Sequence, residues 1–126
     1  MYRCVLAGVA AAGLALGAGA QTARHFPADA LRGTLVVGDP PEATLNGQPA
    51  RLAPAARIRA QNNMLVLSGS ISGAKLLVHY TLDLGGQLKD VWVLRPEEAA
   101  LRPWPTSTAQ AQAWVFDPVN QVWSKP

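Results

Sequence analysis

The feature that most restricts the fold of this 126-residue chain is a series of short apolar runs that begins at Leu31. Gly, Pro or Asn ends each run, a spacing typical of an all-β sandwich or barrel. Asn46-Gly47 supplies the two residues that best fit the positive φ angles of a type I′ turn. Residues 42–52 are therefore expected to form a tight hairpin. Pro49 cannot donate a hydrogen bond to a ladder, which predicts an edge position for the second strand.

Residues 75–95 give the clearest β signal in the chain. Gly85-Gly86 separates two runs rich in β-branched and aromatic residues, as in a hairpin. With the glycines in the loop, Tyr80 lies opposite Val91 and Leu82 opposite Lys89. One face is then a core face, made of Leu76, Val78, Tyr80, Val91 and Val93. The other face is only half polar and needs a cover; it carries Leu77, His79 and Thr81 against Leu94, Trp92 and Asp90.

The pattern after Arg95 becomes helical. Pro96 fits the first turn of a helix, where Glu97 and Glu98 favour the positive N-terminal end. A Thr/Ser cluster then predicts the cap of a second short helix at residues 109–113. These features complete the predicted fold class: a small, mainly β single domain with a partly open antiparallel barrel or sandwich, one or two short C-terminal helices and a terminal hairpin.

The terminal hairpin is predicted from the stretch WVFDPVNQVW, residues 114–123. A loop at Asp117–Asn120 places Trp114 opposite Trp123. A lone two-stranded hairpin is barely stable in water, so these rings need a surface to lie on. We expect the segment to act as a clasp over the sheet face with Leu77, His79 and Trp92. The alternative is an exposed aromatic platform for a ligand.

The first twenty residues have the order of a secretory signal peptide. Arg3 precedes an apolar run from Val5 to Leu16, and small residues end in Ala18-Gly19-Ala20. Cleavage between Ala20 and Gln21 would leave a lead-in segment at residues 21–30 and a β domain at 31–126, with its clasp from about residue 96. The alternative is a retained membrane anchor, although the run is short and diluted by glycine.

Export and composition together suggest a destination. The Ala, Arg and Pro bias is typical of bacterial proteins, so the expected compartment is the periplasm or the exterior. Cys4 is the only cysteine and would leave with the signal, so neither a disulfide framework nor a cysteine zinc site is expected. The exported chain would contain no transmembrane segment.

Basic residues are concentrated in one part of the chain. Between Ala43 and Leu82 there are four basic residues and no acidic residue. Arg57 and Arg59 alternate with Ile58 on a predicted strand, and with Arg51 and Arg32 they would form a patch for an anionic partner. The alternative is a solvated outer face. Nucleic acid is not an expected partner, because aromatic residues do not interleave with these cations.

Catalytic chemistry has no recognisable constellation in the sequence. His25 and His79 are the only histidines, and neither has a second histidine or a cysteine at metal-ligand spacing. Ser72 and Lys75 match the spacing of penicillin-binding serine enzymes, but the further motifs of that family are absent. No cofactor, metal or catalytic residue is therefore predicted.

The stretch from Arg32 to Arg59 resembles the opening of small exported bacterial β-barrel domains of unassigned function. The shared scheme is a strand, an "LNG" hairpin and an "ARIR"-like strand. This resemblance implies a barrel related in shape to OB or SH3-like folds and carries no catalytic residues.

These observations favour an exported, non-catalytic binding or accessory module of the cell envelope. The alternatives are an envelope structural protein and, third, a small envelope hydrolase. The expected partner is an envelope protein or an anionic envelope component. The candidate binding surface consists of the basic stretch and the large aromatics: Arg51, Arg57, Arg59, His79, Trp92, Trp104, Trp114 and Trp123.

Overall fold

The structure is a computed structural model that describes residues 23–126; the predicted signal peptide and its cleavage site lie outside this range. The elements in chain order are β1 Leu31–Val37, β2 Glu42–Leu45, β3 Gln48–Arg59, β4 Leu65–Val66, a 3-10 turn η1 Ser68–Ile71, β5 Lys75–Leu82, β6 Leu88–Val93, α2 Pro96–Ala99, α3 Thr108–Ala113, β7 Val115–Asp117 and β8 Val122–Ser124. Within residues 23–126, no helix has the length and apolar character that a membrane crossing requires.

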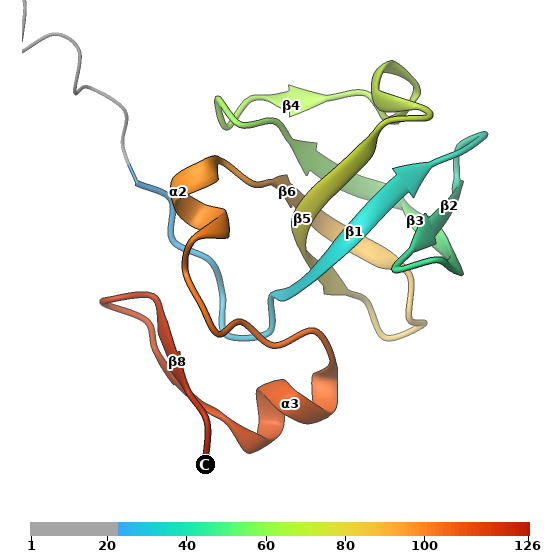
Figure 1. Ribbon diagram of the computed structural model, residues 1–126. Coiled ribbons are helices and arrows are strands. Elements are labelled where there is room, and N and C mark those ends of the chain that lie inside the picture. The colour runs from blue at the N-terminus through green and yellow to red at the C-terminus, as the bar shows by residue number, and fades with distance from the viewer. Residues whose placement is uncertain (1–22) are drawn as a thin grey trace, which may run out of the picture.

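Five strands close into a small barrel (Figure 1). They pair in the order β2, β1, β5, β6, β3, and a further pairing of β3 with β2 completes the ring, while β4 extends from β3 outside it. The predicted mainly β fold with short C-terminal helices and a terminal hairpin is confirmed. The barrel is closed rather than partly open, and it is mixed rather than antiparallel, because β3 and β6 run parallel.

Strand β3 makes this closure because it changes partners along its length. Its first residues pair with β2, its last residues pair with β4 and β6, and the pairing with β6 is irregular between Leu52 and Arg57. Pro49 lies opposite Thr44 before the pairing with β6 begins, so the absence of its N–H breaks no contact with that neighbour. The sequence predicted an edge strand; β3 as a whole is not one, because it pairs with β2, β6 and β4, but the residues around Pro49 pair on one side only.

The hairpin between β2 and β3 has the predicted two-residue turn. Asn46 and Gly47 have φ angles of 54° and 80°, which a type I′ turn requires. The side-chain oxygen of Asn46 also accepts a hydrogen bond from the Thr34 backbone N–H at 2.9 Å. This bond ties the turn to β1.

Within residues 23–126, strands β5 and β6 supply four of the ten buried residues of the barrel core, and β1 to β3 supply the other six. Tyr80 pairs with Val91 as predicted, but an irregularity after Thr81 places Leu82 opposite Leu88 instead of Lys89. The predicted core face is confirmed, since Val78, Tyr80 and Val91 are buried. The other fully enclosed apolar members of this core are Leu31, Leu35, Val37, Ala43, Leu52, Ile58 and Leu88.

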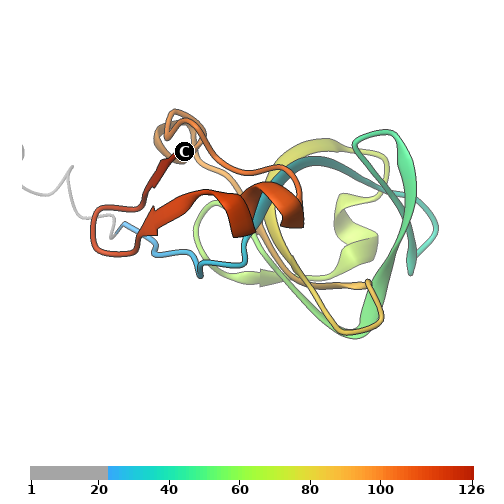
Figure 2. The same cartoon turned by 90° about the horizontal axis from the view of Figure 1, so that it is seen from below.

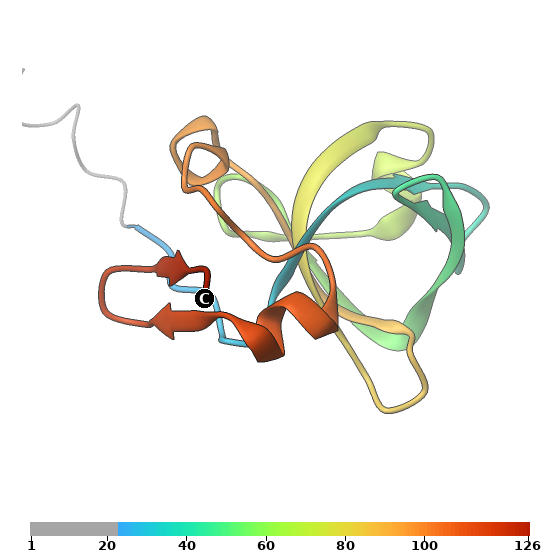
Figure 3. The ribbon, with the colours of Figure 1, turned by 60° about the horizontal axis from the view of Figure 1, so that its bottom comes forward.

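A second apolar core lies outside the barrel, between its β5–β6 face and the C-terminal segment. Its buried members are Phe26, Ala30, Leu94, Trp104 and Trp123. Figures 2 and 3 show the C-terminal hairpin and α3 gathered with the lead-in segment at one side of the barrel. The Gln121 side chain exchanges hydrogen bonds with the Phe26 backbone, so the lead-in segment is part of this second core.

The two short helices form where their caps predict. Pro96 begins α2, and the Ser107 hydroxyl caps α3 by accepting a hydrogen bond from the Gln110 backbone N–H. The terminal hairpin differs from the prediction in register: Phe116, not Trp114, lies opposite Trp123. The loop shifts by one residue because Gln121 adopts a left-handed φ of 55°.

The clasp prediction is confirmed for Trp123, which is 3 % exposed. Trp123 stacks on Phe116 and makes an edge contact with Trp104, at ring-centroid distances of 4.7 Å and 6.1 Å. Trp104 in turn stacks on His79 of β5 at 4.1 Å. The hairpin therefore covers the predicted face through an intervening layer made of Trp104 and Phe26.

Candidate anion-binding cleft

A polar cleft of about 750 Å³ opens on the outer face of β3 and β6, where the lead-in segment passes over them. Four of its lining residues are arginines, and Trp92 contributes an aromatic wall. The complete lining is Ala23, Arg24, His25, Pro27, Arg57, Arg59, Asn62, Asn63, Asp90, Trp92 and Arg95. We call this site the arginine cleft.

Alternation along β3 aims Arg57 and Arg59 into the cleft. Ile58 between them is buried in the barrel core, so its two neighbours point outward. The parallel register places Arg57 beside Asp90 and Arg59 beside Trp92. The guanidinium of Arg59 lies 3.5 Å from an Asp90 carboxylate oxygen and 5.7 Å from the centre of a Trp92 ring.

Arg57 differs from the other arginines of the cleft. Its side chain is exposed, and it makes no ion pair with any residue in the range 23–126. An arginine in this state keeps its five N–H donors for an incoming anion. Arg57 is therefore the cation of the cleft that is best prepared for a ligand.

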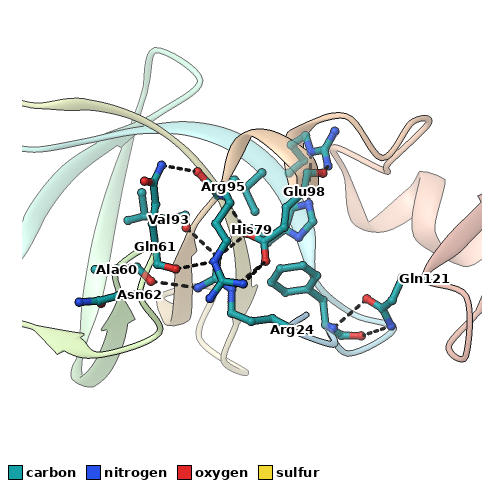
Figure 4. A network of polar contacts seen from close by, with 12 residues as sticks. Arg24, Ala60, Gln61, Asn62, His79, Val93, Arg95, Glu98 and Gln121 are labelled. Atoms are coloured by element: carbon teal, nitrogen blue, oxygen red, sulfur yellow. Dashed lines mark hydrogen bonds and ion pairs between the residues drawn. The ribbon is translucent and has the colours of Figure 1, made fainter. Parts of the chain in front are cut away.

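The back of the cleft is a buried ion-pair network around Glu98 (Figure 4). Arg24 donates from Nε to Glu98 at 2.8 Å and forms a second, shorter bond through its terminal nitrogen. It also donates to the backbone carbonyls of Ala60 and Val93. Arg24 thus joins the lead-in segment to β6, α2 and the turn after β3, so its role in the cleft is structural.

The Glu98 carboxylate is also held by Arg95. The Arg95 backbone N–H donates to it at 2.8 Å, which caps α2, and the Arg95 guanidinium lies 3.9 Å away. Burial alone would raise the pKa of Glu98, but the hydrogen bonds and charges of Arg24 and Arg95 hold this pKa below its ordinary value. Glu98 is therefore ionised in the folded protein at neutral pH.

The charge of the cleft follows from these pairs. Among residues 23–126, the guanidinium groups of Arg24, Arg57, Arg59 and Arg95 at this cleft outnumber the carboxylates of Asp90 and Glu98 by two. Because the cleft is concave, its walls focus the positive potential on the space between them. This arrangement favours an anionic ligand.

The predicted basic patch is only partly assembled. Arg57 and Arg59 lie in the cleft, but Arg51 lies near the other end of β3, where it pairs with Glu42 at 2.5 Å. Arg32 points toward the second core, donates to His79 at 3.2 Å and lies over Trp104. These two arginines are not part of a common surface with Arg57.

The aromatic residues of the predicted binding surface are also divided. Trp92 lines the arginine cleft, whereas His79, Trp104 and Trp123 are buried in the second core and are not surface residues. Trp114 is partly exposed on the terminal hairpin, with the Lys125 ammonium 5.4 Å from its ring centre. The aromatic half of the predicted surface is thus mainly a packing core.

His79 is held neutral by its surroundings. It is 0 % exposed, and Phe26 and Trp104 enclose its ring. Burial, followed by the charges of Arg32 and Arg24, lowers its pKa to about 3. Its Nε2 accepts the hydrogen bond from Arg32, so a proton-transfer role at the surface is not open to this histidine.

Several cleft residues were not predicted from the sequence. Arg24 and His25 belong to the lead-in segment, and Asn62 and Asn63 belong to the turn after β3. Their sequence signal is weak, because pairings such as Arg24 with Glu98 span 74 positions. Within residues 23–126, no group of three histidine, cysteine or acidic side chains is arranged to hold a metal ion.

Comparison of this chain with protein-family models, with curated proteins and with solved structures finds no match.

Proposed function

We propose that this protein is an exported, non-catalytic binding module of the cell envelope and that the arginine cleft holds an anionic group of its ligand. The observation that carries the proposal is Arg57, an exposed and unpaired guanidinium, within residues 23–126, on a concave surface with excess positive charge. Export is proposed from the apolar run Val5–Leu16 and the small residues that follow it. The destination we propose is the periplasm or the exterior.

The barrel supports a relation in shape to small OB or SH3-like domains, which we propose from the Arg32–Arg59 stretch. Five short strands close around one core, and the outer faces of β3 and β6 remain available for a ligand. Folds of this size serve as platforms for many ligands, so the fold itself indicates no function. The arginine cleft is the feature that supports the proposed one.

The substitution Arg57→Gln tests the cleft. We expect it to weaken the binding of inorganic polyphosphate, a soluble polyanion, by about tenfold, because a charge-assisted contact is lost. Stability should change by less than about 1 kcal/mol, since the side chain is exposed. Isothermal titration calorimetry at two salt concentrations measures both the affinity and its electrostatic part.

Arg51→Gln is the matched control, because it removes the same charge from the same strand outside the cleft. We expect its affinity for polyphosphate to stay within about twofold of the parent. Equal weakening by the two substitutions, or by neither, would contradict the proposed role of the cleft.

A further inference from the structure

The segment that follows the turn after β3 and includes β4 exposes three large aliphatic side chains beside the arginine cleft. Met64, Leu65 and Leu67 are 65 %, 64 % and 81 % exposed. Single exposed apolar residues are ordinary on protein surfaces, but a cluster of them beside a charged cleft marks an interaction surface. The position of this cluster relative to the cleft arginines therefore needs explanation.

Strand register places Leu65 of this cluster on the same face as Arg59 of the cleft. Ile58 pairs with Val66 toward the core, so the next pair, Arg59 and Leu65, points outward together. On its other side, Arg59 lies beside Trp92 of β6. Three neighbouring strands thus present an aliphatic, a cationic and an aromatic side chain in one row.

An apolar groove of about 380 Å³ lies against the opposite side of β4. It is lined by the turn after β3 together with Val66, Ile71, Leu76 and Val93. Asn62 lines both this groove and the arginine cleft. The arginine cleft and this apolar groove therefore meet at one turn, on the two sides of β4.

We propose that this face, formed by Arg57, Arg59, Trp92, Leu65 of β4 and Leu67 just after it, docks on an anionic phospholipid surface. The inference rests on the proposed function and names its ligand. Aliphatic side chains enter the boundary between headgroups and acyl chains, while the arginines contact lipid phosphates. Tryptophan favours the same interfacial depth, because its ring is apolar and its N–H is polar.

A second exposed apolar surface, on the terminal hairpin, fits an anionic membrane less well. Val115 and Val122 are exposed on the outer face of the terminal hairpin. The pairing of Asp117 with Val122 places a carboxylate on that same face. Like charges repel, so this hairpin is expected to face away from the lipid.

The test measures binding to vesicles of equal parts phosphatidylglycerol and phosphatidylcholine. The protein is used in the form in which it is isolated from the cells that produce it, with any processing by those cells left as it is. The substitution pair Leu65→Ser/Leu67→Ser is expected to weaken binding at least tenfold, because two inserted aliphatic side chains are lost. Arg57→Gln is expected to weaken it about fivefold. Vesicles of phosphatidylcholine alone should bind the parent far more weakly.

The matched control is Leu84→Ser/Val119→Ser, which removes two exposed aliphatic side chains elsewhere on the surface. Its vesicle affinity should stay within about twofold of the parent. Circular dichroism melting curves for every variant verify that each is folded at the temperature of the binding assay.

The outcomes separate this inference from the proposed function. If the parent and the Leu65→Ser/Leu67→Ser variant bind vesicles equally, the lipid surface is overturned. If Arg57→Gln still weakens polyphosphate binding in that case, the proposed function stands, and an envelope protein becomes the occupant of this face. If Arg57→Gln affects neither polyphosphate nor vesicles, both proposals fail. Equal losses in the β4 variant and its control also overturn the inference.

Discussion

Truncating Trp104 to alanine is expected to lower the free energy of unfolding by about 3–5 kcal/mol, the range for a large buried aromatic. Trp104 is 5 % exposed and lies between His79 of the sheet and Trp123 of the terminal hairpin. Its indole N–H donates to the Ala30 carbonyl at 2.9 Å. The truncation therefore leaves a cavity and removes the hydrogen-bond partner of a buried carbonyl.

Urea denaturation of the variant and the parent measures this loss. Trp114→Ala is the control, because that ring is partly exposed and contacts the second core from its edge. We expect the control to cost about 1 kcal/mol, the centre of the range for ordinary substitutions. A Trp104→Ala midpoint equal to that of the parent would contradict the second core and the clasp.

Glu98→Ala is expected to cost a similar 3–5 kcal/mol, for an electrostatic reason. Glu98 neutralises Arg24 and Arg95, whose side chains are 6 % and 10 % exposed. Removing the carboxylate takes away the counter-charge that Glu98 supplies to these buried guanidinium groups. The same substitution at the exposed neighbour Glu97 should stay within about 0.5 kcal/mol of the parent, because surface positions tolerate change.

The contribution of Glu98 should also depend on pH. Its pKa in the folded protein is below the ordinary value of 4.5, so the ion pairs stabilise the fold fully above that pH. This stability is lost as pH falls through the lowered folded-state pKa. His79, with its pKa of about 3, adds a second loss of stability, which begins as pH falls below about 6.5. We expect this loss in the parent and in Glu98→Ala alike. The difference between the parent and Glu98→Ala should therefore shrink only in acid; a difference that is constant down to pH 3 would contradict the ionised pair.

Local sequence signals predicted the elements that depend on local chemistry. The Asn46-Gly47 turn, the capped helices and the alternation around Ile58 each depend on a few adjacent residues. The core face of β5 and β6 followed from a period of two around a glycine turn. These features are fixed by steric preference and burial, so short stretches were enough.

Long-range pairings escaped the same reasoning. The pairing of β1 with β5 and the parallel pairing of β3 with β6 leave no local pattern, because no tight turn joins the paired segments. Trp104 lies in a proline-rich stretch without periodicity, so its place at the centre of the second core was not predicted. The predicted loop of the terminal hairpin began one residue too early, at Asp117 instead of Pro118. The reason is that Gln121 takes a left-handed conformation, which sequence rules assign to glycine or asparagine.

The candidate site was predicted in part: Arg57, Arg59 and Trp92 were expected on the binding surface and lie in the cleft. Arg24 and Arg95 were not expected there. Alternation correctly grouped Arg57 with Arg59, but it also included Arg51, which lies six residues away, about 20 Å along a regular strand. The interruption between Leu52 and Arg57 further separates the two ends of β3. Arg24 and Asp90 complete the cleft through tertiary contacts, which no spacing rule provides.

The most direct test of the arginine cleft as a lipid-binding surface is a two-dimensional NMR titration of ¹⁵N-labelled protein with bicelles of phosphatidylglycerol and phosphatidylcholine. We expect the largest shifts at the backbone amides of Arg57, Arg59 and Leu65 and at the Trp92 indole N–H. The amides of the terminal hairpin, residues 115–124, should remain in place. Shifts centred on that hairpin, or an unchanged spectrum at saturating bicelle concentration, would contradict the proposed lipid-docking face.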